Sequence, residues 1–153
     1  MNILKALKSD HVAVKAILAD ILKTTERAEK KRKTLFDKFK AEIVAHSRAE
    51  EIVVYERLKS IKEDRDTILE GYEEHYLVDK LIAEIERLSP SDEVWTAKVT
   101  IVKEMLEHHI EEEEKEIFSM LRKEFDPDSL NTFGEQFEGL KAQRKGKAAK
   151  AAA

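Results

Sequence analysis

Histidine and carboxylate side chains recur at a helical spacing at two places in the sequence. His46 is followed by Glu50, and His109 by Glu113, each four residues later. Residues four apart lie one turn along the same helix face, so each pair presents an imidazole beside a carboxylate. The stretches HSRAEEIVVY (46–55) and HIEEEEKEIF (109–118) also share a second glutamate and an aromatic residue nine positions after the histidine. The repetition predicts one ligand arrangement presented twice.

These ionisable residues interrupt stripes of apolar residues rather than lying in polar segments. Apolar residues recur at three- and four-residue spacing over 2–24, 33–60, 66–88 and 91–124, which predicts four long amphipathic helices. The interruptions are His11 in the first stripe, His46 with Glu50, His75 with Asp79, and His109 with Glu113. His108 lies off the stripe and is expected to face outward.

The positions of the turns indicate that the four histidines lie at one level. In an antiparallel bundle, that requires each turn to fall midway between successive histidines. The three midpoints fall in the polar runs 24–33, 59–66 and 89–93. Histidines from all four helices can therefore converge on one layer of the core.

The histidines and glutamates singled out above can also be explained without a metal. A lone inward histidine is usually a hydrogen-bonded core residue, and a glutamate run such as 111–114 is usually solvated, as we expect for Glu111 and Glu112. Burying several ionisable groups without partners costs several kcal/mol per charge, which a marginally stable domain cannot tolerate. Metal ions would satisfy the whole set, so a metal site is favoured over a purely structural polar layer.

The ligand types restrict the kind of site. The chain has no cysteine, which excludes disulfides, thiolate zinc sites and iron–sulfur clusters. Four histidines and two carboxylates are too many for one tetrahedral zinc and fit two carboxylate-bridged ions, with iron, manganese or zinc suited by ligand type. No histidine follows a glutamate by three residues, as a ferritin-like site requires, and the His-Glu-x-x-His protease signature is absent.

Composition indicates a single helical unit. The 153 residues are 42% apolar and 39% charged, with four Gly and two Pro, which favours an all-α fold. We predict an up-down-up-down antiparallel four-helix bundle over 1–125. A short fifth helix at 129–142, with Leu130, Phe133, Phe137 and Leu140 on one face, and a frayed basic tail would make up 126–153. A net charge of −4 argues against nucleic acid as a partner, and the lack of a signal or membrane-spanning pattern predicts a cytoplasmic protein.

The combined pattern resembles the hemerythrin-like family of histidine–histidine–glutamate cation-binding domains. The family pattern His, His-x-x-x-Glu, His, His-x-x-x-Glu is matched by residues spread over roughly 1–124: His11, His46, Glu50, His75, His109 and Glu113. The resemblance implies that the four histidines ligate two irons, which Glu50 and Glu113 bridge. Glu114 is the alternative bridge, because oxygen-carrying members use the carboxylate five residues after the last histidine.

The sequence departs from the oxygen carriers at one further ligand. Those members have a fifth histidine at the position of Asp79, which puts reversible oxygen carriage in doubt. Asp79 is expected to be a ligand or to orient His75, and Tyr72 to donate a hydrogen bond to a metal-bound oxygen.

The resemblance implies a non-haem di-iron protein that binds O2, peroxide or NO. Whether it also has a weak peroxidase, catalase-like or NO-related activity is left open. Two alternatives remain at this stage, an iron storage or sensor module without catalysis and a metal-free structural bundle.

Overall fold

Within residues 1–152, long stretches of helix-favouring residues form seven α-helices, two of which continue from another helix through a π-helical turn. The computed structural model describes the backbone of residues 1–152 and the side chains of residues 1–150. The elements in chain order are α1 (Ile3–Leu22), α2 (Glu29–Glu50), η1 (Glu51–Tyr55), α3 (Glu56–Leu58), α4 (Arg65–Glu86), α5 (Glu93–Glu112), η2 (Glu113–Ile117), α6 (Phe118–Glu124) and α7 (Pro127–Ala152). No strand occurs among residues 1–152, so the all-α prediction is confirmed.

The helix boundaries agree with the predicted segments to within a few residues, except in the last segment. Asn2 caps α1 by accepting from the amide of Lys5, and Asp92 caps α5 by accepting from the amide of Val94. The predicted short fifth helix at 129–142 was too short, because α7 continues to Ala152. The segment read as a frayed tail is therefore helical as far as Ala152, and Ala153 lies outside the described residues. Lysine and alanine, which both favour helices, dominate this extension.

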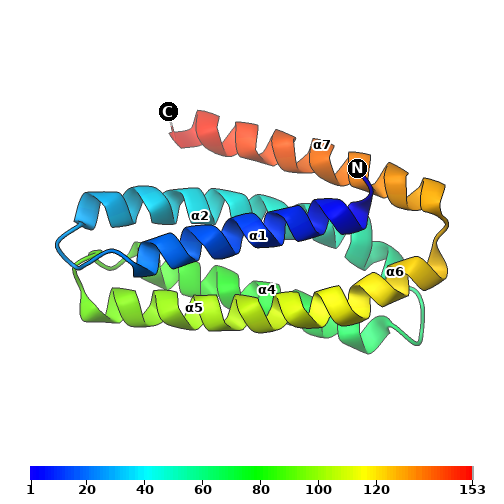
Figure 1. Ribbon diagram of the computed structural model, residues 1–153, viewed down its shortest axis with the longest axis horizontal. Helices are drawn as coiled ribbons and strands as arrows, with labels where there is room; N and C mark the ends of the chain where they lie inside the picture. The colour runs from blue at the N-terminus through cyan, green and yellow to red at the C-terminus, as the bar shows by residue number, and fades with distance from the viewer. Residues whose placement is uncertain (153) are drawn as a thin grey trace.

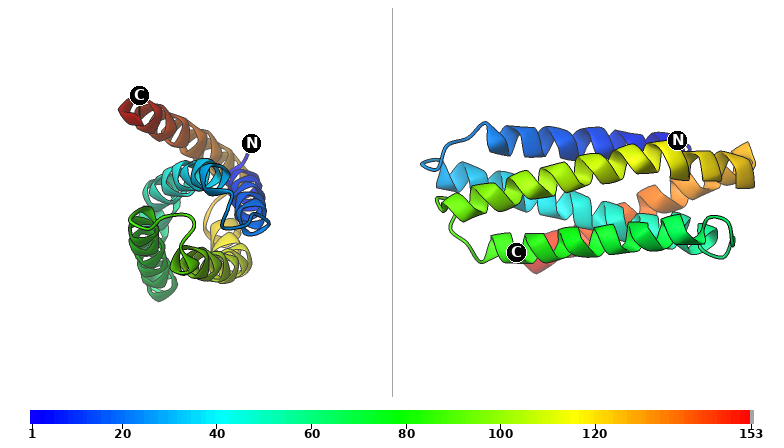
Figure 2. Two further views of the ribbon diagram at one scale, coloured as in Figure 1. Left: turned by 90° about the vertical axis from the view of Figure 1, so that its left-hand side faces the viewer. Right: turned by 90° about the horizontal axis from the view of Figure 1, so that it is seen from below.

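Successive long helices run in opposite directions along one axis (Figure 1). Seen end-on, α1, α2, α4 and α5 surround that axis, and α7 lies outside them, packed against α1 and α2 (Figure 2). The predicted apolar face of α7 makes this contact possible, since Leu130, Phe133 and Phe137 are buried.

The interior contains two clusters of buried apolar residues. One cluster lies toward the α7 attachment and is formed by residues such as Leu7, Val53, Ile68, Leu121 and Phe137. The other occupies the remaining length of the bundle and contains residues such as Leu18, Phe39, Ile82, Trp95 and Val102. Along the four long helices the buried histidines and glutamates lie at or near the places where one cluster gives way to the other. A layer of ionisable side chains therefore crosses the core.

Within the part of the chain that the structure describes, no helix combines the length and apolar character needed to cross a membrane.

Candidate metal centre

The six predicted ligands meet in the buried layer. His11, His46, His75 and His109 are between 2% and 5% exposed, and Glu50 and Glu113 are at most 1% exposed. Their donor atoms form two groups, each with all its atoms within 4.8 Å of one another. One group is His11, His46, Glu50 and Glu113, and the other is Glu50, His75 and His109.

Each of the two carboxylates faces one histidine from each pair. The oxygens of Glu50 lie 3.2 Å from Nε2 of His75 and 3.8 Å from Nε2 of His46. Those of Glu113 lie 3.2 Å from Nε2 of His109 and 3.7 Å from Nε2 of His11. Both carboxylates therefore stand between the two histidine pairs, as bridging ligands would.

Several of these donor atoms have no hydrogen-bond partner. Both carboxylate oxygens of Glu50, both of Glu113 and Nε2 of His11 are buried without one. Such groups are normally satisfied in folded proteins, because leaving them unpaired is costly. Oxygen and imidazole nitrogen donors in this number fit divalent metal ions.

A second set of carboxylates holds the outer nitrogen of each histidine. The Nδ1 atoms of His46, His75 and His109 lie 2.9, 2.7 and 3.0 Å from Asp10, Glu51 and Glu74, and Nδ1 of His11 lies 3.3 Å from Glu114. An ionised carboxylate only accepts, so Nδ1 donates and the lone pair of Nε2 points inward. Carboxylate partners of this kind orient metal-binding histidines.

These contacts settle the position of Glu114 and Asp79. Glu114 is a partner of His11 on the outside of the layer, whereas Glu113 points into it. Asp79 is not among the clustered donors: it pairs with Arg48 at 2.8 Å, and Arg48 contacts Glu51, which accepts from His75. Glu51, rather than Asp79, is thus the carboxylate at Nδ1 of His75, and the role of Asp79 as a ligand or as an orienting residue stays a prediction.

A tyrosine not predicted to lie at the site is in contact with it. Tyr55 is fully buried, and its hydroxyl lies 3.5 Å from Nε2 of both His75 and His109. Its ring stacks on His75 with 5.2 Å between centroids. Burial and the charges of Glu50 and Glu113 raise its pKa well above the usual value, so the hydroxyl keeps its proton. Tyr72, the tyrosine predicted from the sequence, instead packs edge-on against Tyr55.

The π-helical turns explain how Tyr55 reaches the layer. Each turn, η1 or η2, begins at or just after one of the two inward-facing glutamates and closes with a hydrogen bond between residues five apart. Residues five apart therefore share a face, as Glu50 does with Tyr55 and Glu113 with Phe118. Phe118 stacks on His11 with 6.4 Å between centroids, as Tyr55 does on His75. The repeat in the sequence is thus a repeat in structure, with a hydroxyl on one side only.

Gly71 is required for the packing of Tyr55. A Cβ at this position would lie 2.7 Å from the Tyr55 hydroxyl and 2.9 Å from its ring carbons. We expect Gly71→Ala to lower the free energy of unfolding by about 1–3 kcal/mol, measured by urea denaturation, since the stacked ring cannot move aside. Gly139→Ala in α7 is the matched control: nothing lies within 4 Å of its Cβ, so helix propensity should make it neutral or stabilising. Equal effects of the two variants would contradict the crowding argument.

Three groups of the layer, His75, His109 and Glu113, have raised pKa values in the absence of metal. Burial and the charge of Glu50 raise the pKa of Glu113 well above its usual value. Burial alone would lower the pKa values of His75 and His109, but contacts with Glu50 and Glu51, and with Glu74, raise them. Burial, together with His46, lowers the pKa of His11 to about 3, so its lone pair is free.

Metal binding should therefore release protons. Groups with raised pKa values hold their protons to a higher pH than usual, and a bound cation displaces those protons. We expect affinity to fall as pH falls, by about tenfold per pH unit for each proton released. Titration calorimetry at pH 7 in two buffers of different ionisation enthalpy measures the number released, and a value of zero would contradict the assignment.

The comparisons with known proteins give the family. The profile of the hemerythrin HHE cation-binding domain matches residues 2–121, which contain all six inward-facing residues. The chain belongs to this family. A solved structure of an HHE domain-containing protein, an Rv2633c homologue from Mycobacterium kansasii, is similar, with a TM-score of 0.85 and 24% identity over 98% of this chain and 91% of that one. At this identity, the likeness supports the fold alone.

A curated relative is a longer protein. The chain is 26% identical over 143 residues to a protein named DNA nickase from Nostoc sp. (strain PCC 7120 / SAG 25.82 / UTEX 2576). The match covers 94% of this HHE-family chain and 40% of the relative, so the chain spans less than half of that protein's length.

Proposed function

We propose that this HHE-domain chain holds a pair of iron ions inside an up-down-up-down antiparallel bundle and binds O2, peroxide or NO at that carboxylate-bridged centre. The observation that carries the proposal is the convergence of buried, unpartnered donor atoms from Glu50, Glu113 and His11 among the inward nitrogens of the other three histidines. The family match supports a metal cation as the species that would satisfy them.

Two sides of the centre would each hold one ion. His11 and His46 supply imidazole nitrogens to one side, and His75 and His109 to the other. The shared placement of Glu50 and Glu113 between the pairs supports bridging, because each of them faces both sides. Two five- or six-coordinate ions would together take about ten to twelve donor atoms. The four histidines and two glutamates supply fewer, which leaves room for an external ligand.

Iron bound there would supply open coordination positions and reversible one-electron chemistry. The chain contributes orientation: the outer carboxylates keep the proton on Nδ1 of each histidine and direct Nε2 inward. Tyr55 contributes a proton held on its hydroxyl beside His75 and His109, where it could donate to a small ligand. The apolar clusters on either side of the layer exclude water.

The ligand we propose is small because the centre is buried. Nucleic acid is not part of the proposal: the net charge is −4, and the nickase name belongs to a protein of which this chain spans 40%. The proposal leaves open whether the bound ligand is turned over in a weak peroxidase, catalase-like or NO-related reaction.

Metal content per chain and the ultraviolet–visible spectrum test the proposal. We expect about two irons per chain and charge-transfer absorption that changes on anaerobic reduction and on adding peroxide or NO. Iron that exchanges without any spectral response to these ligands would favour the storage or sensor alternative. A fully folded, metal-free protein after growth with excess iron would overturn the proposal in favour of the structural bundle.

A further inference from the structure

The outer carboxylates of His46 and His109, the two histidines of the repeated His-x-x-x-Glu pattern, differ in what covers them. On the His46 side, Asp10 is only 11% exposed at its side chain and pairs with Lys141 of α7. Phe137 of α7 lies edge-on to His46, with 5.5 Å between the ring centroids. Helix α7 therefore covers the outer carboxylate of His46, whereas Glu114, the outer partner of His11, is 25% exposed at its side chain.

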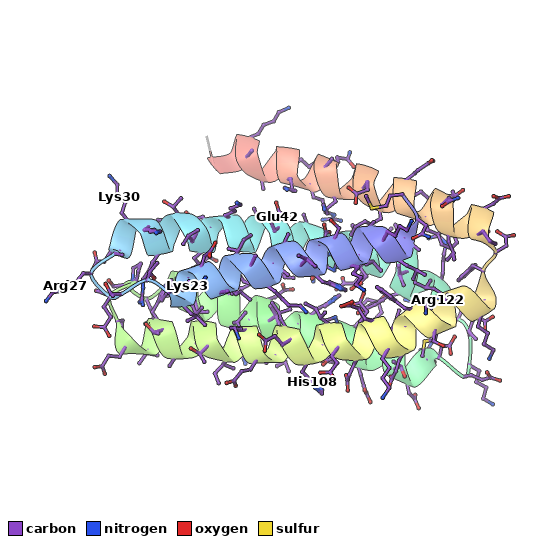
Figure 3. All side chains as sticks on the ribbon, in the orientation of Figure 1. Lys23, Arg27, Lys30, Glu42, His108 and Arg122 are labelled. Atoms are coloured by element: carbon purple, nitrogen blue, oxygen red, sulfur yellow. The ribbon has the colours of Figure 1, made fainter. Side chains whose placement is uncertain are left out.

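The corresponding carboxylate on the other half is partly open. Glu74 of α4 accepts from Nδ1 of His109 at 3.0 Å, and its side chain is 27% exposed. It lies beside His108 and Glu112 of α5, and one donor atom from each of these three residues falls within 4.8 Å of the others. His108 projects from the outer side of α5 (Figure 3). This half thus carries an imidazole and two carboxylates at the surface.

A histidine–glutamate pair on a helix surface is not in itself a site. His108 and Glu112 are four residues apart and 3.2 Å from each other, a common arrangement that contributes little. Two observations distinguish this one. Glu74 joins the pair from another helix, and the same glutamate contacts a histidine of the buried centre.

A third observation is a small cavity whose lining includes Glu74 and Glu112 of the surface group and two residues of the centre. Its volume is about 10 Å³, and both Glu74 and Glu112 at the surface and His109 and Glu113 in the core line it. Such a volume is about enough for one water-sized particle. Both oxygens of Glu113 are buried and without a partner, so the inner end of the cavity presents free ligand atoms.

We propose that Glu74, His108 and Glu112 form a surface site that captures a divalent cation such as Fe²⁺ and passes it to His109 and Glu113. The inference rests on the proposed function, since it supplies the route by which the buried centre is filled. Glu74 would contact the ion at the surface and then return to His109 once the ion has moved inward. The ion keeps its charge throughout, and the protons that it displaces from the inner residues go to solvent.

The ligand set suits a transient site. One imidazole nitrogen and two carboxylate oxygens are donors that first-row divalent ions accept. His108 and Glu112 have side chains 66% and 44% exposed, so water competes for the ion and holds it weakly. The centre, by contrast, offers six buried donor residues. The gradient in donor number favours movement inward.

The rate of metal uptake tests the inference. Apo-protein is mixed anaerobically with two equivalents of Fe²⁺, and unbound Fe²⁺ is trapped with a coloured chelator at successive times. The variant is His108→Ala combined with Glu112→Gln. Glu107→Gln is the matched control, because it removes an exposed carboxylate from the same helix that pairs with Lys103 rather than with this group.

We expect uptake by the double variant to be at least about tenfold slower than by the wild type, with the same two irons per chain at the end and the same spectrum. The control should load at the wild-type rate. Unchanged uptake in the double variant would overturn the inference, as would equal slowing in both variants, which would indicate general electrostatic attraction. A lower final metal content in the double variant would also overturn it. If the wild type takes up no iron, the proposed function itself fails.

Discussion

Replacing Glu113 by glutamine should empty the centre. We expect Glu113→Gln to reduce the iron content from about two per chain to less than one after purification, measured by elemental analysis. The substitution keeps the shape of the side chain but removes the negative charge, and Glu113 is the carboxylate that faces both His11 and His109. The loss in affinity should exceed the roughly 10–100-fold that follows removal of an outer partner of a ligand.

Neighbouring glutamates of the same run provide graded controls. Glu111→Gln alters an exposed residue and should leave two irons bound. Glu114→Gln removes the negative charge of the outer partner of His11, so it should weaken binding by no more than about 10–100-fold. Glu113→Gln protein that retains two irons with an unaltered spectrum would rule out its role as a bridge.

Removing the metal should destabilise the fold strongly. Ions that bind the folded state alone stabilise it by about 4 kcal/mol when free metal is a thousandfold above its dissociation constant. For a domain of this size, that corresponds to a fall in Tm of roughly 8–16 °C after chelation. The cost of the unpartnered oxygens of Glu50 and Glu113 in the apo-protein is one source of this binding free energy. Scanning calorimetry before and after chelation measures the fall in Tm.

The variant that carries both Glu50→Gln and Glu113→Gln is the control for this experiment. Its core lacks the two buried carboxyl groups that would bind metal, so it should fold without metal, and the chelator should not change its Tm. A wild-type Tm that stays the same after complete removal of iron would show that the layer is satisfied without ions, as the structural alternative holds.

The sequence was sufficient to predict the inward-facing residues because their spacing follows the helix period. His46 with Glu50 and His109 with Glu113 interrupt apolar stripes, and a residue on an apolar stripe of a long helix must face the core. The level of the layer followed from the polar runs between helices, since short turns leave little freedom in register. Both arguments use local periodicity, which the structure preserves up to the π-helical turns.

The outer partners could not be predicted in the same way. Glu51 directly follows Glu50, and Glu74 and Asp10 directly precede His75 and His11. None of the three lies on an apolar stripe that would mark it. Which carboxylate reaches which histidine depends on the packing of neighbouring helices, and Asp79 was chosen because it lies one turn from His75 on the same helix. Glu51 reaches His75 from a different helix.

Tyr55 was missed for a different reason. Nine residues after His46, it would lie on the opposite face of a regular α-helix, and only the wider turn of η1 brings it into line with Glu50. Tyr55 and Phe118 both lie nine residues after a histidine of the repeated stretches, and this match could have pointed to Tyr55. An aromatic residue at the same offset in both halves indicates a shared departure from α-helical geometry.

The full length of α7 could also not be predicted from the spacing of its apolar residues. The apolar face ends near Leu140, and the residues beyond it are held by charge: Lys141 pairs with Asp10, and Lys145 with Glu42. A basic segment of this kind resembles a tail in sequence until the acidic residues of α1 and α2 are in place beside it.

The layer of ionisable groups also divides the interior into two apolar compartments. Cooperativity in a small helical protein normally comes from one continuous core, in which every helix contacts the same body of side chains. Here the two compartments would be linked by metal ions, which the protein must take from its surroundings. How sharply the polypeptide folds would then depend on the metal available in its surroundings, so that nutrient supply becomes a variable in its folding equilibrium.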